Sequence, residues 1–277
     1  MSLKFTHFKC PLIKPISVGD VILNSREWIE IDSGYYKVDL APLPGLHRET
    51  LMESFADFKS HNTPKTPSAL FAKEAMSLKV ELGAKSKINL LDFIDLAISP
   101  NDYLLSWKDQ ESVKLKIGRN DLSLEAKWLK EITSKISNKL KLRLDGNLQF
   151  KSLELIEYLK NIDSSKIEYL EEPLSDLSEW PSVFKQINIP LALDENIDRR
   201  TTTPGVVNIV VKPTFNLSLE NTLREIREEN FQITISSSFD PPNNLAILHA
   251  LGSLTKGHSG LDTLKYFNLE ELISSPL

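Results

Sequence analysis

Five short apolar segments of the chain each end at a charged residue, and these residues follow one another at nearly even spacing. The end residues are Lys116, Asp145, Glu171, Asp194 and Lys212, separated by 29, 26, 23 and 18 residues. One strand, one helix and two loops need about that much chain. Parallel strands joined by helices point the same way, and β/α barrels place their catalytic groups where the strands end. The spacing therefore predicts an α/β barrel with these five side chains gathered at its mouth.

The first 90 residues follow a different pattern. Alternating apolar and polar residues predict antiparallel strands over 3–9, 28–32 and 35–40, with a tight turn at 32–34. Residues 48–60 and 67–82 have helical periodicity. The segment 11–24 is expected to be a loop of the kind that closes over a barrel mouth and selects the substrate. We therefore expect an α+β domain over 1–90 and a barrel over 91–265.

Within the barrel region, short apolar strands alternate with amphipathic helices such as 122–140. Two further strands are expected to end near Ser99 and Ser238, and a last short segment, 259–262, is a candidate to close the ring. The total is about seven or eight strands, which is compact for a barrel.

Composition excludes several other classes of protein. Hydrophobic residues make up 41% of the chain and charged residues 26%, and the net charge is −5, so neither a nucleic-acid-binding stripe nor a disordered acidic arm is expected. Cys10 is the only cysteine, which excludes an intrachain disulfide and is consistent with a buried small side chain. No apolar run reaches the ~18 residues of a membrane helix. We expect a cytoplasmic enzyme, monomeric or homodimeric, with a small-molecule carboxylate substrate and no nucleic-acid or membrane partner.

The five end residues are chemically complementary. Carboxylate oxygens from Asp145, Glu171 and Asp194 suit Mg²⁺ or Mn²⁺. A divalent ion facing a substrate carboxylate stabilises the dianion that forms when the neighbouring carbon loses a proton, and a lysine crowded by cations has its pKa lowered enough to remove that proton. Lys116 and Lys212 come from opposite ends of the series, so we expect them to face each other across the substrate. Acidic residues at strand ends also cap helices, but even spacing of five complementary groups favours a functional site.

These residues lie in motifs that resemble a known family. The motifs Lys114-Leu115-Lys116, Arg143-Leu144-Asp145-Gly146-Asn147, Glu171-Glu172-Pro173, Asp194-Glu195 and Val211-Lys212-Pro213 together resemble the muconate-lactonising branch of the enolase superfamily. Within that branch the chain is most similar to the o-succinylbenzoate synthase family, through Leu40-Ala41-Pro42-Leu43-Pro44-Gly45, Ser236-Ser237-Ser238 and Gly260-Leu261-Asp262-Thr263. The resemblance covers nearly the whole chain.

The resemblance implies a fold and a reaction. The fold is a modified (β/α)₇β TIM-like barrel with an N-terminal α+β capping domain, which the C-terminal tail 266–277 joins. The reaction is the dehydration of 2-succinyl-6-hydroxy-2,4-cyclohexadiene-1-carboxylate to o-succinylbenzoate in menaquinone biosynthesis, by lysine proton abstraction and a metal-stabilised enediolate. The enzyme class is a carbon–oxygen lyase.

The resemblance also implies a role for each matching residue. Mg²⁺ binds Asp145, Glu171 and Asp194. Lys116 is the base, Lys212 stabilises the enediolate, and Lys114 supports Lys116. The remaining expected contacts are Asn147 near the metal site and Ser236 and Gly260 at the succinyl end of the substrate. Arg143 is open to a second interpretation, because a strand interior also places an arginine for packing and pairing alone.

Two departures from the family concern substrate fit. Phe239-Asp240-Pro241-Pro242-Asn243-Asn244 replaces a turn that usually contains serine and glycine, and Asn196 stands where serine is common. Neither change affects the metal ligands or the lysines. The same site would also suit N-succinyl amino acid racemisation, dipeptide epimerisation or muconate cycloisomerisation, and a catalytically inactive binding barrel is a further alternative.

Overall fold

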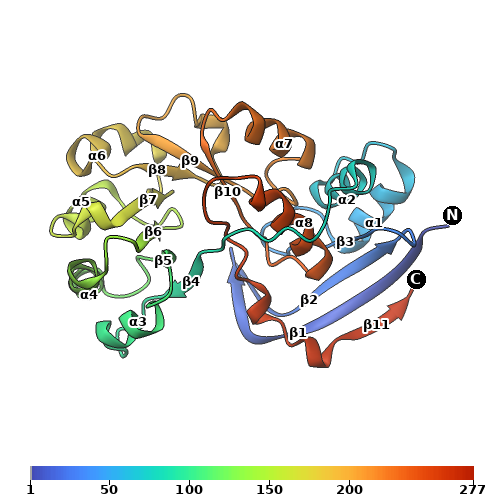
Figure 1. Ribbon diagram of the computed structural model, residues 1–277, viewed down its shortest axis with the longest axis horizontal. Helices are drawn as coiled ribbons and strands as arrows, with labels where there is room; N and C mark the ends of the chain where they lie inside the picture. The colour runs from blue at the N-terminus through green and yellow to red at the C-terminus, as the bar shows by residue number, and fades with distance from the viewer. Residues whose placement is uncertain (1) are drawn as a thin grey trace. The chain divides into compact units, whose positions relative to one another are not determined.

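An antiparallel sheet forms the centre of one of the two compact units into which the chain divides. The computed structural model describes residues 2–277 (Figure 1). The first unit holds residues 2–87, Val211–Asn230 and Ile235–Leu277, and the second holds Ile88–Val210 and Phe231–Thr234. The sheet of the first unit has the strand order β11-β1-β2-β3, with bounds β1 Lys4–Val18, β2 Val21–Asp32, β3 Lys37–Leu40 and β11 Ile273–Pro276.

The segment 11–24 is not a loop, and that prediction was wrong. It forms the outer half of a long β1–β2 hairpin, in which Val18 pairs with Val21 and Gly19 takes a φ of +54° at the turn. The register shifts between Pro11 and Ile16, and such a bulge tolerates proline in a strand. The β-branched residues of the segment favour the extended backbone. The two prolines therefore mark an irregularity in a strand.

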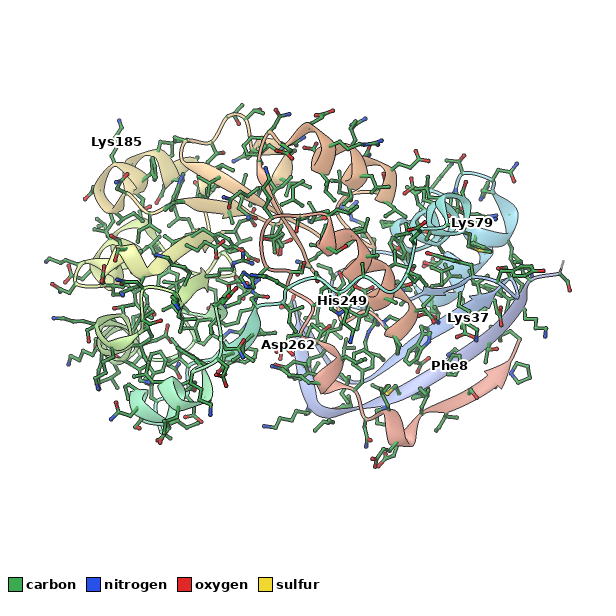
Figure 2. All side chains as sticks on the ribbon, in the orientation of Figure 1. Phe8, Lys37, Lys79, Lys185, His249 and Asp262 are labelled. Atoms are coloured by element: carbon green, nitrogen blue, oxygen red, sulfur yellow. The ribbon has the colours of Figure 1, made fainter. Side chains whose placement is uncertain are left out.

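The turn predicted at 32–34 is confirmed. The Gly34 amide donates to Asp32 Oδ1 at 2.6 Å, and Gly34 has a φ of +84°. The core beside β1 and β2 contains Trp28, whose ring stacks on Phe8 at 5.4 Å, and fully buried Cys10 (Phe8 is labelled in Figure 2). Burial of Cys10 agrees with its expected role as a small apolar side chain.

Local signals mark the start of one helix and the end of another in the first unit. Helix α1 spans Leu51–Ser60 and follows Thr50, which forms a reciprocal capping box with Glu53. Helix α2, Pro67–Leu78, ends before the predicted residue 82 because Lys79 adopts a left-handed backbone that terminates it. This unit also contains α7 Leu219–Glu228 and α8 Pro242–Ser253.

The second unit is built on a curled sheet of seven strands in the order β10-β9-β8-β7-β6-β5-β4. The pairs from β4 to β9 are parallel. Figure 1 shows α3 Pro100–Ser106, α4 Leu122–Lys135, α5 Ser152–Leu159 and α6 Trp180–Ile187 on one face of the sheet. The strand bounds are β4 Leu90–Phe93, β5 Ser112–Lys116, β6 Lys141–Asp145, β7 Ile167–Glu171, β8 Leu191–Leu193, β9 Val206–Val211 and β10 Gln232–Ile235. The predicted α/β fold class is confirmed by this parallel sheet and the antiparallel N-terminal sheet, while the boundary at 90/91 stays a prediction.

Some predicted element ends were wrong. Strand β4 ends at Phe93 and not near Ser99. Ser99 is instead the N-cap of α3, where its hydroxyl accepts from the Asp102 amide. The predicted closing segment, 259–262, contributes only an isolated parallel bridge between Ser236 and Gly260. Helix α4 ends at Lys135, five residues before the predicted end.

Alternation along the strands separates an apolar face from a polar one. Leu115 and Leu144 are fully buried, and between α3 and α4 the rings of Tyr103, Trp107 and Trp128 pack edge to face. The predicted apolar stripe of α4 is buried as expected. The opposite face of β5, β6 and β7 is therefore left to the charged residues.

Within residues 2–277, none of the helices combines the length and apolarity that crossing a membrane requires.

Candidate active site

The register of three neighbouring strands places the predicted charged residues side by side. Lys114 is paired with Arg143, Lys116 with Asp145, and Asp145 with Glu171. Residues two apart on a strand share a face, so Lys114 and Lys116 both face the two carboxylates. Asp145 and Glu171 are each only 2% exposed. The register alone thus assembles a buried, charged cluster at the carboxyl ends of β5, β6 and β7.

Both lysines of β5 contact the same carboxylate oxygen. Lys114 Nζ lies 2.8 Å from Asp145 Oδ2 and 2.7 Å from Glu171 Oε1. Lys116 Nζ lies 2.5 Å from Asp145 Oδ2 and donates to Asn147 Oδ1 at 2.8 Å. The backbone amide of Asn147 also donates to Asp145 Oδ1 at 3.0 Å. Asn147 therefore adjoins the predicted base and the predicted ligand at once.

The pKa values of the two lysines shift in opposite directions, although burial lowers both. Loss of solvent is the largest influence on the pKa of Lys116, and with the neighbouring Lys114 charge it outweighs Asp145, so the pKa lies below its usual 10.5. Burial also acts on Lys114, but Asp145 and Glu171 outweigh it and raise the pKa above the ordinary value. Lys114 is therefore held as a cation, whereas Lys116 is biased toward the neutral amine that a base requires.

The pKa values of the Asp145 and Glu171 carboxyl groups also shift in opposite directions. Burial opposes ionisation of Asp145, but Lys114 and Lys116 outweigh it and keep its pKa below the usual range. Burial and the charge of Asp145 raise the pKa of Glu171 to about 7. Glu171 Oε2 is buried and has no hydrogen-bond partner. An unpartnered buried carboxylate oxygen is costly unless a cation or donor satisfies it.

A small acidic pocket adjoins the cluster. Asp194 directly follows β8, and Ala192 of that strand is paired with Glu171. The pocket has a volume of about 10 Å³, close to that of one water-sized sphere. Its lining is Asp145, Asn147, Leu148, Glu171, Glu172, Asp194 and Glu195. The three predicted ligands thus line one space.

Within residues 2–277, no three His, Cys, Asp or Glu side chains already stand as a complete ligand set. The ammonium groups of Lys114 and Lys116 both contact the Asp145 carboxylate. The donor set still fits a hard divalent cation, because it consists of carboxylate oxygens and includes the orphaned Glu171 Oε2.

The other predicted residues lie in the first unit. Lys212 follows β9, and its backbone amide donates to Asn216 Oδ1 at 2.8 Å. Ser236 and Gly260 are bridged, and the Ser237 amide donates to the Gly260 carbonyl at 3.0 Å. A Cβ at Gly260 would lie 2.9 Å from Ser236 Oγ, so a larger residue there would displace the serine hydroxyl. Ser236 and Gly260 are therefore brought together as a pair.

Arg143 packs and pairs within the second unit. Its Nε and Nη2 donate to the two oxygens of Glu168 at 2.8 and 2.9 Å, and its guanidinium lies 5.0 Å from the Tyr169 ring centre. These contacts match the packing interpretation of Arg143.

His47 is a buried side chain that the sequence patterns did not single out. It is 8% exposed; its Nδ1 accepts from the Leu43 amide at 3.0 Å, and its Nε2 donates to the Thr214 carbonyl at 2.8 Å. No local pattern signals this role, because Thr214 lies 167 residues away in the chain.

Glu125 of α4 was also missed. Its fully buried carboxylate accepts from the amides of Gly118 at 2.6 Å and Asn120 at 3.2 Å, and from the Tyr158 hydroxyl at 2.7 Å. It thereby holds the loop that follows Lys116. An acid in the first turn of a helix ordinarily indicates only a favourable dipole interaction.

Known proteins resemble this chain in sequence. Residues 106–206 match the "Enolase C-terminal domain-like" family. The resemblance predicted from the motifs is confirmed. The o-succinylbenzoate synthase of Aliivibrio fischeri is 26% identical over 96% of this chain and 91% of its own, and that of Citrobacter koseri is 23% identical over 93% and 90%. These relatives support the prediction of an enzyme, and of a lyase in particular.

Solved structures share the fold. The o-succinylbenzoate synthase of Thermosynechococcus elongatus, complexed with Mg in its active site, has a TM-score of 0.78 at 22% identity and covers 96% of this chain and 94% of that one. An N-succinyl Arg/Lys racemase from Bacillus cereus has a TM-score of 0.71 at 13% identity and covers 100% and 94%. One fold therefore serves more than one reaction, and the reaction has to be argued from the site.

Proposed function

We propose that this chain catalyses the Mg²⁺-dependent dehydration of 2-succinyl-6-hydroxy-2,4-cyclohexadiene-1-carboxylate to o-succinylbenzoate, in menaquinone biosynthesis. The observation that carries the proposal is the pairing of Lys116 with Asp145 in register, beside Glu171 and the acidic pocket. A potential base and three oxygen ligands thereby occupy one strand-end face. The synthases that resemble this chain over more than nine-tenths of its length support the choice of reaction.

Asp145, Glu171 and Asp194 are the residues that would hold the metal ion. When bound, Mg²⁺ would supply the positive charge that stabilises a second negative charge on the substrate carboxylate. Mn²⁺ would suit the same oxygen donors. The unpartnered Glu171 Oε2 gives this site an acceptor that no protein donor already occupies.

Lys116 is the proposed base. Its neutral amine would take the proton from the ring carbon that bears the carboxylate, and the electron pair of that C–H bond would form the enediolate. Hydroxide would then leave from the neighbouring carbon. The proton and the hydroxide together account for one water, and the ring becomes aromatic. Lys114, kept cationic by Asp145 and Glu171, would favour the neutral state of Lys116 through repulsion between the two ammonium groups.

The remaining assignments complete the proposal. Lys212 would stabilise the enediolate by its charge, and Ser236 and Gly260 would contact the succinyl end. Asn147, which accepts from Lys116, would orient the base toward the substrate. We place the enzyme in the cytoplasm, acting on a small carboxylate as a monomer or homodimer without nucleic-acid or membrane partners.

The test follows the ultraviolet absorbance of the cyclohexadiene substrate with the full-length protein. Wild type with Mg²⁺ should consume the diene rapidly, and excess EDTA should stop it. Lys116→Ala should lose about 10²–10⁴-fold in rate or more, the scale of general-base catalysis. Lys185→Ala, which removes an exposed lysine from α6, is the matched control and should retain wild-type turnover.

Two outcomes would contradict the proposal. Turnover that survives Lys116→Ala or chelation would refute the mechanism. An inert diene, combined with deuterium uptake at the α-carbon of an N-succinyl amino acid, would identify a racemase of the same fold instead.

A further inference from the structure

Glu172, next to the predicted ligand Glu171, has an unusual backbone conformation. Its φ is +30°, outside the regions that residues with a side chain normally occupy. Such a conformation persists only where surrounding bonds hold it, and it occurs often at functional sites. Glu172 is 3% exposed, so the bonds that hold it lie within the protein.

The side chain of Glu172 binds the loop that follows the predicted ligand Asp194. One carboxylate oxygen accepts from the Glu195 amide at 3.1 Å, and the other accepts from the Asn196 amide at 2.7 Å. Both donors belong to the two residues directly after Asp194. A carboxylate that accepts two backbone amides fixes their positions, because charge-assisted hydrogen bonds are short and directional.

The backbone of Glu172 binds the other two ligand-bearing segments. Its amide donates to the Ala192 carbonyl at 3.1 Å, two residues before Asp194. Its carbonyl accepts from the Leu148 amide at 2.8 Å, three residues after Asp145. Glu172 is therefore tied to the chain beside each predicted ligand.

The two adjacent glutamates have different hydrogen-bonding states. Both oxygens of the Glu172 carboxylate accept backbone amides, whereas Glu171 Oε2 has no partner. Although Glu172 lines the acidic pocket, its oxygens are already committed to the protein. Glu171 is therefore the better metal ligand, whereas Glu172 holds the segments that carry the predicted metal ligands.

We infer that Glu172 is a positioning residue, which sets the spacing of Asp145, Glu171 and Asp194 before a divalent cation binds. This inference rests on the proposed function, because it assigns Glu172 a task in the same metal site. Outer groups that orient ligands typically change metal affinity by about 10–100-fold when they are altered.

The experiment is calorimetric titration of metal-free, full-length protein with Mg²⁺, which requires no turnover. Glu172→Gln keeps the length of the side chain. Its side-chain NH₂ group cannot accept a hydrogen bond, so one of the two backbone amides of Glu195 and Asn196 would lose its acceptor. Glu172→Asp keeps the negative charge but shortens the reach. Glu157→Gln is the control, because it removes the same charge from an exposed position on α5 that does not line the pocket.

We expect both Glu172 variants to bind Mg²⁺ about 10–100-fold more weakly, and Glu157→Gln to change the affinity by about threefold or less. If Glu172→Asp binds like wild type, or Glu157→Gln weakens binding as much as Glu172→Gln, charge alone matters and the inference is overturned. Wild type that fails to bind Mg²⁺ would overturn the proposed function and the inference together. Wild type that binds Mg²⁺ with the same affinity as the Glu172 variants would overturn the inference alone.

If the Glu172 variants do not fold, hydrogen exchange of the wild type in EDTA decides. The amides of Glu195 and Asn196 should exchange slowly without metal, since Glu172 already binds them. Fast exchange at both amides would overturn the inference.

Discussion

Asp39 should make the stability of the first unit fall as the pH rises toward neutrality. The side chain is fully buried; its two oxygens accept from the Asn243 side-chain amide at 3.0 Å and the Asn243 backbone amide at 3.2 Å. Burial raises the pKa of Asp39 to about 7, and the bonds from Asn243 offset only part of that effect. Asp39 lies on β3 and Asn243 in the first turn of α8, so ionisation would strain the contact between these two elements.

The sign and size follow from linkage. An unfolded aspartate has a pKa of about 3.9, so the folded state binds the proton more tightly than the unfolded state. The stability due to protonated Asp39 is fully present below about pH 4 and is lost as the pH rises through about 7. A difference of about three pKa units corresponds to about 4 kcal/mol in total, of which about 2.5 kcal/mol is lost between pH 5 and pH 8.

The assay is urea unfolding followed by circular dichroism at several values between pH 5 and pH 8. Asp39→Asn cannot ionise, so the difference in unfolding free energy between wild type and this variant isolates the contribution of Asp39. Asp32→Asn is the control: the Gly34 amide holds the pKa of Asp32 below its usual range, so this variant should retain the wild-type slope over these pH values. An Asp39→Asn variant with the same slope as wild type would refute the reasoning.

Three further predictions concern stability. Gly45→Ala should lower the unfolding free energy by about 1 kcal/mol or more, because Gly45 has a φ of +87° and an added Cβ would lie 2.2 Å from the Val18 carbonyl; an unchanged melting temperature would contradict this. Glu125→Gln should cost about 1–3 kcal/mol in urea unfolding and speed hydrogen exchange at Gly118, since a buried amide would face backbone donors; unaltered exchange would show that another group holds the loop. Mg²⁺ at about 100 times its dissociation constant should stabilise the wild type by about 2.7 kcal/mol, and Glu171→Gln should reduce that gain; equal stabilisation of both proteins would place the ion elsewhere.

Local patterns in the sequence were sufficient for the strand-end face of the second unit. Lys116, Asp145 and Glu171 are the last residues of β5, β6 and β7, as predicted. Alternation within a strand depends only on the extended backbone, and parallel connections align the strand ends. For the same reason the apolar stripe of α4 could be predicted, because it depends on residues within a few turns of one helix.

The tertiary structure decided what depends on partners far apart in the chain. Pro11 signals a loop by itself, but pairing of β1 with β2 keeps it in a bulged strand. His47 is bonded to the carbonyl of Thr214, which lies far away in the chain. Glu172 owes its proposed role to backbone amides 23 and 24 residues further along the chain. A side chain's type limits which bonds it can make, whereas the folded backbone determines which donors and acceptors lie within reach. The sequence by itself therefore determined which chemical groups end the strands, and packing of distant segments decided which of them are bonded, buried or left with an unpartnered oxygen.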